Sequence, residues 1–443
     1  MKPDYTQSVQ IFASTGERAT MRKKYFVLLT FVLLALTNSV WVSAKGTTAP
    51  KLVSAKAIQG IAKDTSDIRY LALSPDGTKI VWLDVKGKQI CLIVIADTSN
   101  KCFPYGENLG GLGRFSAIAW SPDGRYIATN ESFFDYLNDS DIWIFDTTTG
   151  QFQDRTDDHY FGNALKLPKT AFADYLPTWN STTGDLYMFR TPSKEASLNG
   201  YETNFYQLPV QDGDPTLLQM LSVRLPPLSV YRPVSISPDG KQMAFLVLPS
   251  DYFQNTATGV WVMNLEDKSF KQLVGLSDLQ SGLSPSVSDS QKKGLIPNTI
   301  SWAGNNAIIV STKDSQVSGL IPQNAYYVDI DKGKATPLLD FSNLQSGADY
   351  FKEPADGGLA PAAKSPRAGI VTPDGKGYLY VSTDVPPTSA YVWWKALPPA
   401  AEEPTLIGTI KDFQVTPAAD AEPSISQDGQ EAALFGYLLT LGS

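Results

Sequence analysis

Catalysis by histidine has one location open to it in this sequence, because His159 is the single histidine among the 443 residues. It lies beside Asp157 and Asp158 in the stretch DRTDDHYFGN, where it could act as an acid or base or help to bind a cation. A metal site built from several histidines is excluded, and the Gly-x-Ser-x-Gly stretch of a hydrolase is absent. We therefore expect no catalytic residue, and an enzyme stays open only as an alternative.

Oxygen ligands gather in the stretch FDYLNDSD, which contains Asp135, Asn138, Asp139 and Asp141. Such oxygens suit Ca²⁺, but the stretch lacks the regular spacing and the glycine of a known calcium-binding loop. Paired carboxylates for glycoside hydrolysis would have to come from separate segments of the chain. We expect no cofactor, and Ca²⁺ is the one cation for which the sequence offers a candidate stretch.

An Asp-Tyr dipeptide recurs in four segments that are rich in polar and turn-forming residues. Tyrosine offers a large, rigid, amphipathic contact area, which is why it concentrates at binding hot spots. A simpler role is that the rings cover loop bases while the aspartates cap turns. We predict a binding surface made of these pairs and the histidine segment: Asp135, Tyr136, His159, Tyr160, Asp174, Tyr175, Asp251, Tyr252, Asp349 and Tyr350.

The elements that must position these residues are set by a repeated stretch. It reads ALSPDGTKIVWL from Ala72, AWSPDGRYIATN from Ala119, SISPDGKQMAFL from Ser235, IVTPDGKGYLYV from Ile370 and SISQDGQEAALF from Ser424. Two apolar halves around a Pro-Asp-Gly turn are typical of a β-hairpin, in which glycine takes the φ > 0 position. The motif therefore bends the chain and carries no chemistry. The predicted turn residues are Asp76, Gly77, Asp123, Gly124, Asp239, Gly240, Asp374, Gly375, Asp428 and Gly429.

Looser copies from Thr178 and Ser301 bring the number of repeats to seven, with six or eight as alternatives. A second apolar pair, such as DIWIFDTTTGQFQ from Asp141, follows most copies, so each unit holds four strands. Repeated four-stranded units indicate an all-β protein with a single β-propeller. Because only GYLLTLGS follows the last copy, we predict that the segment from Lys51 supplies the missing outer strand or strands of the last blade.

The W/F-S-P-D-G stretch, followed by an apolar run and an IWIFD-like strand, resembles the TolB-like or WD40-like (PD40) propeller repeat over residues 67 to 441. The Gly-His and Trp-Asp pairs of true WD40 repeats are missing, and the chain lacks room for the α/β domain that precedes the propeller in TolB. The resemblance implies a propeller fold and no particular function.

The N-terminal residues predict export. Arg22, Lys23 and Lys24 form a basic start, an apolar run follows, and Ser43 and Ala44 are small residues suited to cleavage. We assign residues 1–44 to an N-terminal extension and signal peptide, with the signal at 21–44, and residues 45–443 to the propeller. An uncleaved anchor is the alternative, although polar residues interrupt the apolar run. After cleavage we expect a periplasmic or secreted monomer without membrane insertion.

Charge and cysteine content narrow the choice of partners. The formal net charge of −8 argues against nucleic acid and anionic membrane surfaces. Cys91 and Cys102 are the only cysteines, and whether they pair stays open, because the strand register around the DTSN turn does not obviously place them opposite each other.

Long segments all join the second strand to the third, or one blade to the next. They are residues 131–140, 154–174, 191–203, 249–258, 276–298, 313–323 and 341–367, and the side of the ring that they share is called here the long-connection face. Binding often resides in loops on a rigid scaffold. We predict a non-catalytic scaffold that binds an envelope or secreted protein, with a carbohydrate-binding or carbohydrate-active propeller as the alternative.

Overall fold

The fold is taken from a computed structural model of the chain. It describes residues 49–58, 68–84, 88–105, 115–131, 140–158, 172–192, 203–221, 234–247, 258–281, 295–314, 324–339, 368–383, 388–400, 402–413, 423–434 and 436–442. The predicted signal peptide lies outside these residues and stays a prediction. In the part of the chain that is described, no helix has the length and apolar character needed to cross a membrane.

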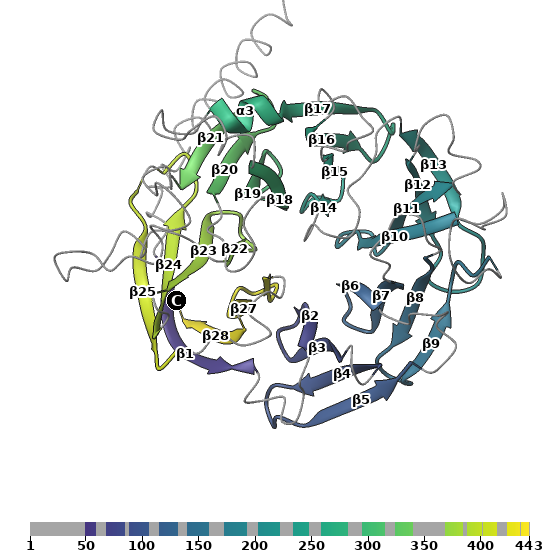
Figure 1. The fold of residues 1–443 in the computed structure, drawn as a ribbon, viewed down its shortest axis with the longest axis horizontal. Coiled ribbons are helices and arrows are strands. Elements are labelled where there is room, and N and C mark those ends of the chain that lie inside the picture. Colours follow the sequence, from purple (N-terminus) through teal and green to yellow (C-terminus); the bar gives the residue numbers. More distant parts are fainter. Residues whose placement is uncertain are drawn as a thin grey trace, which may run out of the picture. The chain divides into compact units, whose positions relative to one another are not determined.

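Seven four-stranded antiparallel sheets are arranged around a ring, which confirms the predicted seven-bladed β-propeller (Figure 1). Blade 1 contains β2 (Ile68–Leu73), β3 (Lys79–Asp84), β4 (Gln89–Val94) and β5 (Asn100–Pro104). Blade 2 contains β6 (Phe115–Trp120), β7 (Tyr126–Glu131), β8 (Ile142–Asp146) and β9 (Gln151–Asp154). Blade 3 contains β10 (Phe172–Trp179), β11 (Leu186–Pro192), β12 (Thr203–Leu208) and β13 (Thr216–Leu221).

The remaining blades repeat the same order from the inner strand to the outer strand. Blade 4 contains β14 (Val234–Ile236), β15 (Gln242–Val247), β16 (Gly259–Asn264) and β17 (Phe270–Gly275), followed by the short helix α3 (Leu276–Ser281). Blade 5 contains β18 (Leu295–Trp302), β19 (Ala307–Asp314), β20 (Asn324–Asp329) and β21 (Lys334–Leu339). Blade 6 contains β22 (Ala368–Val371), β23 (Gly377–Thr383), β24 (Ser389–Ala396) and β25 (Thr405–Lys411).

Blade 7 combines both ends of the described chain. Its strands are β26 (Ser424–Ile425), β27 (Glu431–Leu434), β28 (Tyr437–Gly442) and, outermost, β1 (Lys51–Ala57). β1 pairs antiparallel with β28, from Lys51 opposite Gly442 to Ala57 opposite Tyr437. The prediction that the N-terminal segment closes the ring is confirmed, and one strand is enough to close it.

The Ser-Pro-Asp-Gly turns owe their shape to a small hydrogen-bond network. The Ser121 hydroxyl donates to Oδ1 of Asp123 at 2.5 Å and accepts from the amide of Tyr126 at 2.8 Å. The same Oδ1 accepts from the amide of Arg125 at 3.1 Å, and Gly124 has a φ of 68°. Equivalent serine or threonine bonds to aspartate occur in the turns of Ser74, Ser237, Thr372 and Ser426. These aspartates therefore bond within their own turns.

Neighbouring blades are joined by buried apolar layers and by tryptophans of the inner strands. The indole of Trp302 in blade 5 donates to the carbonyl of Ser235 in blade 4 at 2.9 Å. Trp179 in blade 3 donates in the same way to Ala119 in blade 2 at 3.0 Å. Both faces of a blade are covered, so in the second strands β3 and β15 every residue after the first is buried, and every residue of β23 is buried.

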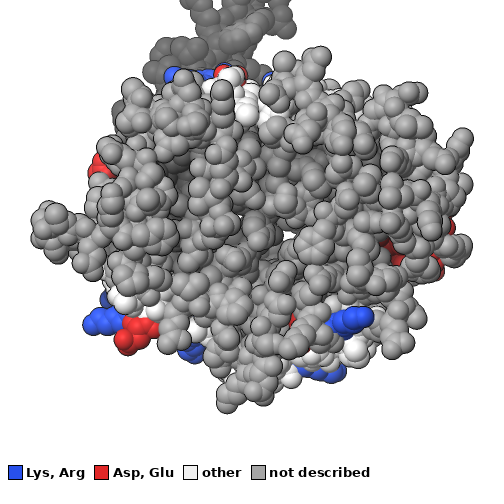
Figure 2. Space-filling model, in the orientation of Figure 1, with Lys and Arg blue, Asp and Glu red and all other residues white. Residues whose placement is uncertain are grey.

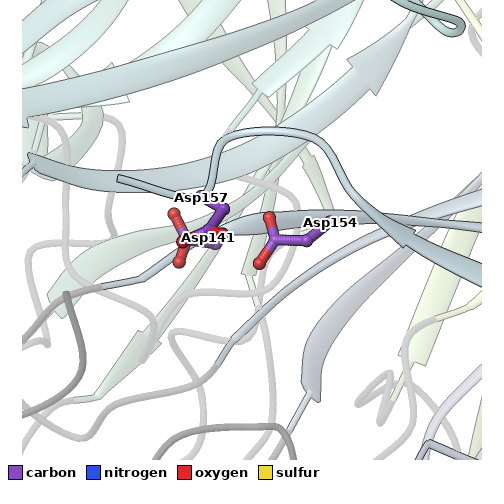
Figure 3. Close-up of side chains that lie close together, drawn as sticks. All are labelled: Asp141, Asp154 and Asp157. Atoms are coloured by element: carbon purple, nitrogen blue, oxygen red, sulfur yellow. The ribbon is translucent and has the colours of Figure 1, made fainter. Parts of the chain in front are cut away.

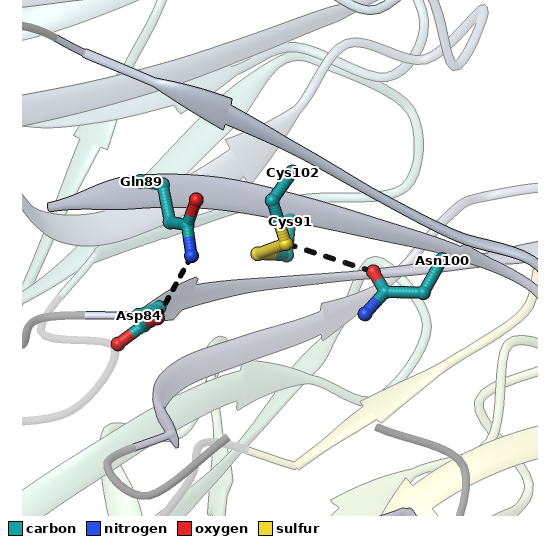
Figure 4. Close-up of a disulfide and its surroundings, with 5 residues drawn as sticks. All are labelled: Asp84, Gln89, Cys91, Asn100 and Cys102. Atoms are coloured by element: carbon teal, nitrogen blue, oxygen red, sulfur yellow. Dashed lines mark hydrogen bonds between the residues drawn. A yellow bond between two sulfur atoms is a disulfide. The ribbon is translucent and has the colours of Figure 1, made fainter. Parts of the chain in front are cut away.

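The two cysteines form a disulfide within blade 1 (Figure 4). Cys91 in β4 lies directly opposite Cys102 in β5, with their Cα atoms 4.0 Å apart. The register that the turn sequence left unclear thus brings the two residues together. Cys91 is fully buried and packs with Trp82 in the core between blades 1 and 7.

Candidate functional site

Connection lengths divide the ring into two unequal sides. In blade 2, short turns at 121–125 and 147–150 join the first strand to the second and the third to the fourth. The connections at 132–141 and 155–171 are longer, and they leave the sheet at its other end. Because strands alternate in direction, the connections between second and third strands and those between blades share one face. The strand bounds therefore agree with the long-connection face defined from the sequence.

Of the predicted binding residues, only Asp174 and Tyr175 belong to the described part of the chain. Both lie in the inner strand β10. The other predicted residues lie outside the described residues: Asp135, Tyr136, His159, Tyr160, Asp251, Tyr252, Asp349 and Tyr350.

Asp174 is turned inward and forms an ion pair with Arg190 of β11. The two residues lie opposite each other in the ladder, and Asp174 accepts from Nε and Nη2 of Arg190 at 2.7 and 2.6 Å. Its side chain is only 1% exposed. Loss of solvation on burial raises the pKa of Asp174, and the bonds from Arg190 act in the opposite direction. This carboxylate therefore helps to hold the base of the long-connection face.

Asp174 also links blade 3 to blade 2. The amide of Asp174 donates to the carbonyl of Ser140 at 2.6 Å, and the Ser140 hydroxyl donates back to the carbonyl of Asp174 at 2.8 Å. The Arg190 guanidinium lies 4.8 and 5.1 Å from the ring centroids of Phe172 and Tyr206. Charge, stacking and main-chain bonds thus fix where the connection before Ser140 reaches the ring.

Tyr175 is half-buried rather than presented as a free ring. Its hydroxyl lies 3.1 Å from Oγ1 of Thr203, and its ring packs with Phe189 in the core between blades 3 and 4. Within this pair the structure favours the simpler role, in which the ring covers a loop base.

Three aspartates come together beside this inter-blade link (Figure 3). Asp141 precedes β8, Asp154 ends β9 and Asp157 follows it, and one carboxylate oxygen from each lies within 4.8 Å of the others. Asp141 is 1% exposed, Asp154 is partly buried and Asp157 is exposed. We call these three residues the acidic cluster.

The acidic cluster is ordered by a threonine. The Thr156 hydroxyl donates to Oδ1 of Asp141 at 3.2 Å and accepts from the amide of Ile142 at 2.9 Å. Asp158 accepts a hydrogen bond from the amide of Phe172 at 2.9 Å. The connection from β9 to β10 is therefore pinned at both ends by short polar side chains.

Electrostatics make Asp154 the unusual member of the cluster. Burial raises its pKa to about 7, and the charges of Asp157 and Asp174 add to the shift, while backbone hydrogen bonds from Thr156 and Asp157 oppose it. Arg155, the nearest cation in the sequence, does not neutralise the group. Its guanidinium donates to main-chain carbonyls of the β12–β13 turn, at 3.1 Å to Pro209 and 3.2 Å to Gly213.

Three carboxylate oxygens at this spacing have the chemistry to hold a hard divalent cation such as Ca²⁺, with water completing the shell. Asp141 belongs both to the predicted calcium stretch and to the cluster, whereas Asp135, Asn138 and Asp139 lie outside the described residues. The sequence analysis did not identify Asp154 and Asp157 as ligands. The predicted hairpin of β8 and β9 could have identified them, because the start of β8 lies beside the end of β9, with Trp143 opposite Asp154.

No protein-family model and no curated protein matches the chain. Among solved structures, the chain is similar to the WD40 repeats of RRP9, with 13% identity, coverage of 89% of this chain and 99% of that chain, and a TM-score of 0.49. It is also similar to an oligogalacturonate lyase in complex with manganese, with 12% identity, coverage of 85% and 90%, and a TM-score of 0.48. A third is the Cps50 (Swd1) propeller domain of Myceliophteria thermophila, with 8% identity, coverage of 89% and 100%, and a TM-score of 0.47. At these identities the likeness concerns the β-propeller fold alone.

Proposed function

We propose that this chain is an exported, non-catalytic propeller of the TolB-like type, which binds an envelope or secreted protein through its long-connection face. The observation that supports this proposal is the segregation of connection lengths. On one side of the ring no connection is longer than the segment 397–404 of blade 6, and the longer connections, such as 132–141, 155–171, 222–233 and 340–367, leave from the other side. A rigid ring with variable segments on one face is the usual arrangement of a binding scaffold.

The bases of two such segments are held firmly in place. Ser140 and Asp174 are joined by two hydrogen bonds, one from the Asp174 amide and one from the Ser140 hydroxyl. Arg190 of the adjacent strand donates to the Asp174 carboxylate. Binding through fixed loop bases loses less conformational entropy than binding through free loops. This supports a role in recognition for the segments that start and end there.

The first test is affinity capture from envelope and secreted fractions with the purified protein. The face variant carries Tyr136→Ala, Tyr252→Ala and Tyr350→Ala, and the control variant carries Glu266→Ala, Asp267→Ala and Lys332→Ala in the short turns of blades 4 and 5. We expect one partner protein to be retained by the wild type and the control variant and lost by the face variant. Thermal unfolding of each variant confirms that the ring is intact.

Retention by both variants, or loss caused by the short-turn substitutions, would contradict the proposal. Enzyme-like turnover of a substrate that disappears with His159→Ala would also overturn it. Binding of the wild type to a glycan array, without capture of a protein, would favour the carbohydrate alternative. Fractionation of cells that produce the chain tests the proposed periplasmic or secreted location separately.

A further inference from the structure

The outer strand of blade 3 differs from the other six outer strands in charge. β13 reads TLLQML and has no charged residue and no proline. It ends its sheet, so the outer edge pairs with no other described strand and lies on the rim of the ring (Figure 1). Exposed strand edges are templates for further pairing, and proteins normally protect them with charge or proline. Each of the other outer strands contains a charged residue: Lys101, Asp154, Lys271, Lys334, Lys411 and Lys51.

Two exposed apolar side chains share one side of β13. Leu217 is 47% exposed and Met220 is 55% exposed, and they are two of the four large exposed hydrophobic residues among those described. An irregularity in the pairing with β12, between Phe205 and Tyr206, shifts the register at this point. Because of this bulge, residues three apart in the sequence point to the same side of the sheet. Leu218 packs instead into the core between blades 3 and 4.

We propose that β13 is a self-association edge, at which two copies of this chain pair antiparallel about a twofold axis. Centred between Leu218 and Gln219, such pairing places Leu217 of each copy opposite Met220 of the other. The contact between Leu217 and Met220 then forms twice, once on each side of the twofold axis, and it covers the exposed apolar side chains of both copies. The other outer strands would carry charged side chains into the paired strands in the same arrangement, whereas β13 carries none. A second copy is therefore the occupant that this edge fits.

In the view of Figure 2, the described charged side chains of both signs lie around the rim of the ring. A contact between two six-residue strands is small by the standards of permanent dimers, and we expect weak, reversible association. The dimer differs from the monomer that the sequence analysis predicted. It leaves the long-connection face of each copy free and gives the assembly two equivalent binding faces.

Sedimentation velocity over a range of concentrations measures the association directly. We expect wild-type protein to show a monomer–dimer equilibrium, and Met220→Lys to raise the dissociation constant by about tenfold or more, because each dimer then buries two unpaired charges. Leu406→Lys is the matched control, since Leu406 is an exposed apolar residue (45%) on another outer strand. This control should leave the equilibrium unchanged.

Cysteine cross-linking tests the register. A mixture of Leu217→Cys and Met220→Cys chains should form intermolecular disulfides faster than either variant alone, because the proposed register places position 217 of one copy opposite position 220 of the other. The native cysteines do not interfere, since they are already bonded to each other. The proposal is overturned by a wild type that stays monomeric at every concentration. It is equally overturned by a dimer that Leu406→Lys weakens as much as Met220→Lys, or by cross-linking of single variants at the rate of the mixture.

Discussion

Single polar side chains do two different jobs in this propeller. In the repeated turns, an aspartate accepts hydrogen bonds from a serine or threonine hydroxyl two residues earlier and from a following amide, and these bonds stabilise its ionised form. The hydrogen bond from Ser121 lowers the pKa of Asp123, and that from Ser426 lowers the pKa of Asp428. Asp154 lies at the opposite extreme, because burial and neighbouring carboxylates oppose its ionisation.

Asp154 should make the stability of the protein depend on pH in the neutral range. Its pKa is raised from 3.8 to about 7 in the folded chain, so between these values the folded state keeps a proton that the unfolded state has lost. The free energy of unfolding therefore falls as pH rises from about 4 to 7 and is flat above. The change in the free energy of unfolding caused by Asp154→Asn, measured against the wild type, should be more favourable at pH 8 than at pH 4 by about 1–2 kcal/mol, after allowance for partial exposure.

Urea unfolding at both pH values checks this expectation. Asp212→Asn, at an exposed position in the β12–β13 turn, serves as the control for loss of one negative charge. Equal effects of Asp154→Asn at the two pH values would show that the carboxyl does not titrate in the neutral range.

At the scale of elements, the hairpins and their order were predictable because the turn motif and the alternation of apolar residues are local signals. The pairing of Cys91 with Cys102 was not settled, since register depends on the conformation of an intervening turn. The acidic cluster was missed for a related reason. Its members are brought together by the β8–β9 ladder, and burial beside Asp174 depends on the next blade.

Inter-blade tryptophans should contribute measurably to the stability of the ring. Trp302 is 6% exposed and its indole bonds to the carbonyl of Ser235. Trp302→Phe removes this donor and part of the buried ring, which should cost about 1–3 kcal/mol in the free energy of unfolding. Chemical denaturation measures the loss, and Trp302→Tyr offers a comparison that keeps a polar group of different reach. A loss below about 0.5 kcal/mol would mean that the bond is not made in solution.

For the whole molecule, the number of blades and the mixed last blade followed from the repeat alone. Seven similar units and an unfinished last one leave a ring that only the other end of the chain can complete. The faces of β1 were not predictable in this way, because a bulge between Leu52 and Ser54 alters the alternation of side chains. Leu52 enters the core between blades 6 and 7, where a Cβ on Gly408 would lie 2.4 Å from its Cδ2 atom.

Two neighbouring positions in β1 should therefore respond very differently to the same change. Leu52→Asp places a charge against the backbone of β25 and should cost about 2–4 kcal/mol in the free energy of unfolding. Val53 is 64% exposed, so Val53→Asp should change stability by no more than about 0.5 kcal/mol. Thermal and urea unfolding of the two variants check this contrast. Similar losses for both would mean that β1 does not pair with β28 in the described register.

Closure by β1 also has a consequence for the time course of synthesis. Ser54 bonds to Thr440 across 386 positions of sequence, so the strand that leaves the ribosome or the export channel first must wait for the strand that leaves last. The circle stays open, and β1 stays unpaired, until nearly the whole polypeptide has been delivered. A circular permutant of residues 49–443 that begins within residues 59–67 and joins residue 443 to residue 49 would turn this longest closure into a short hairpin, and it should fold faster than the natural order.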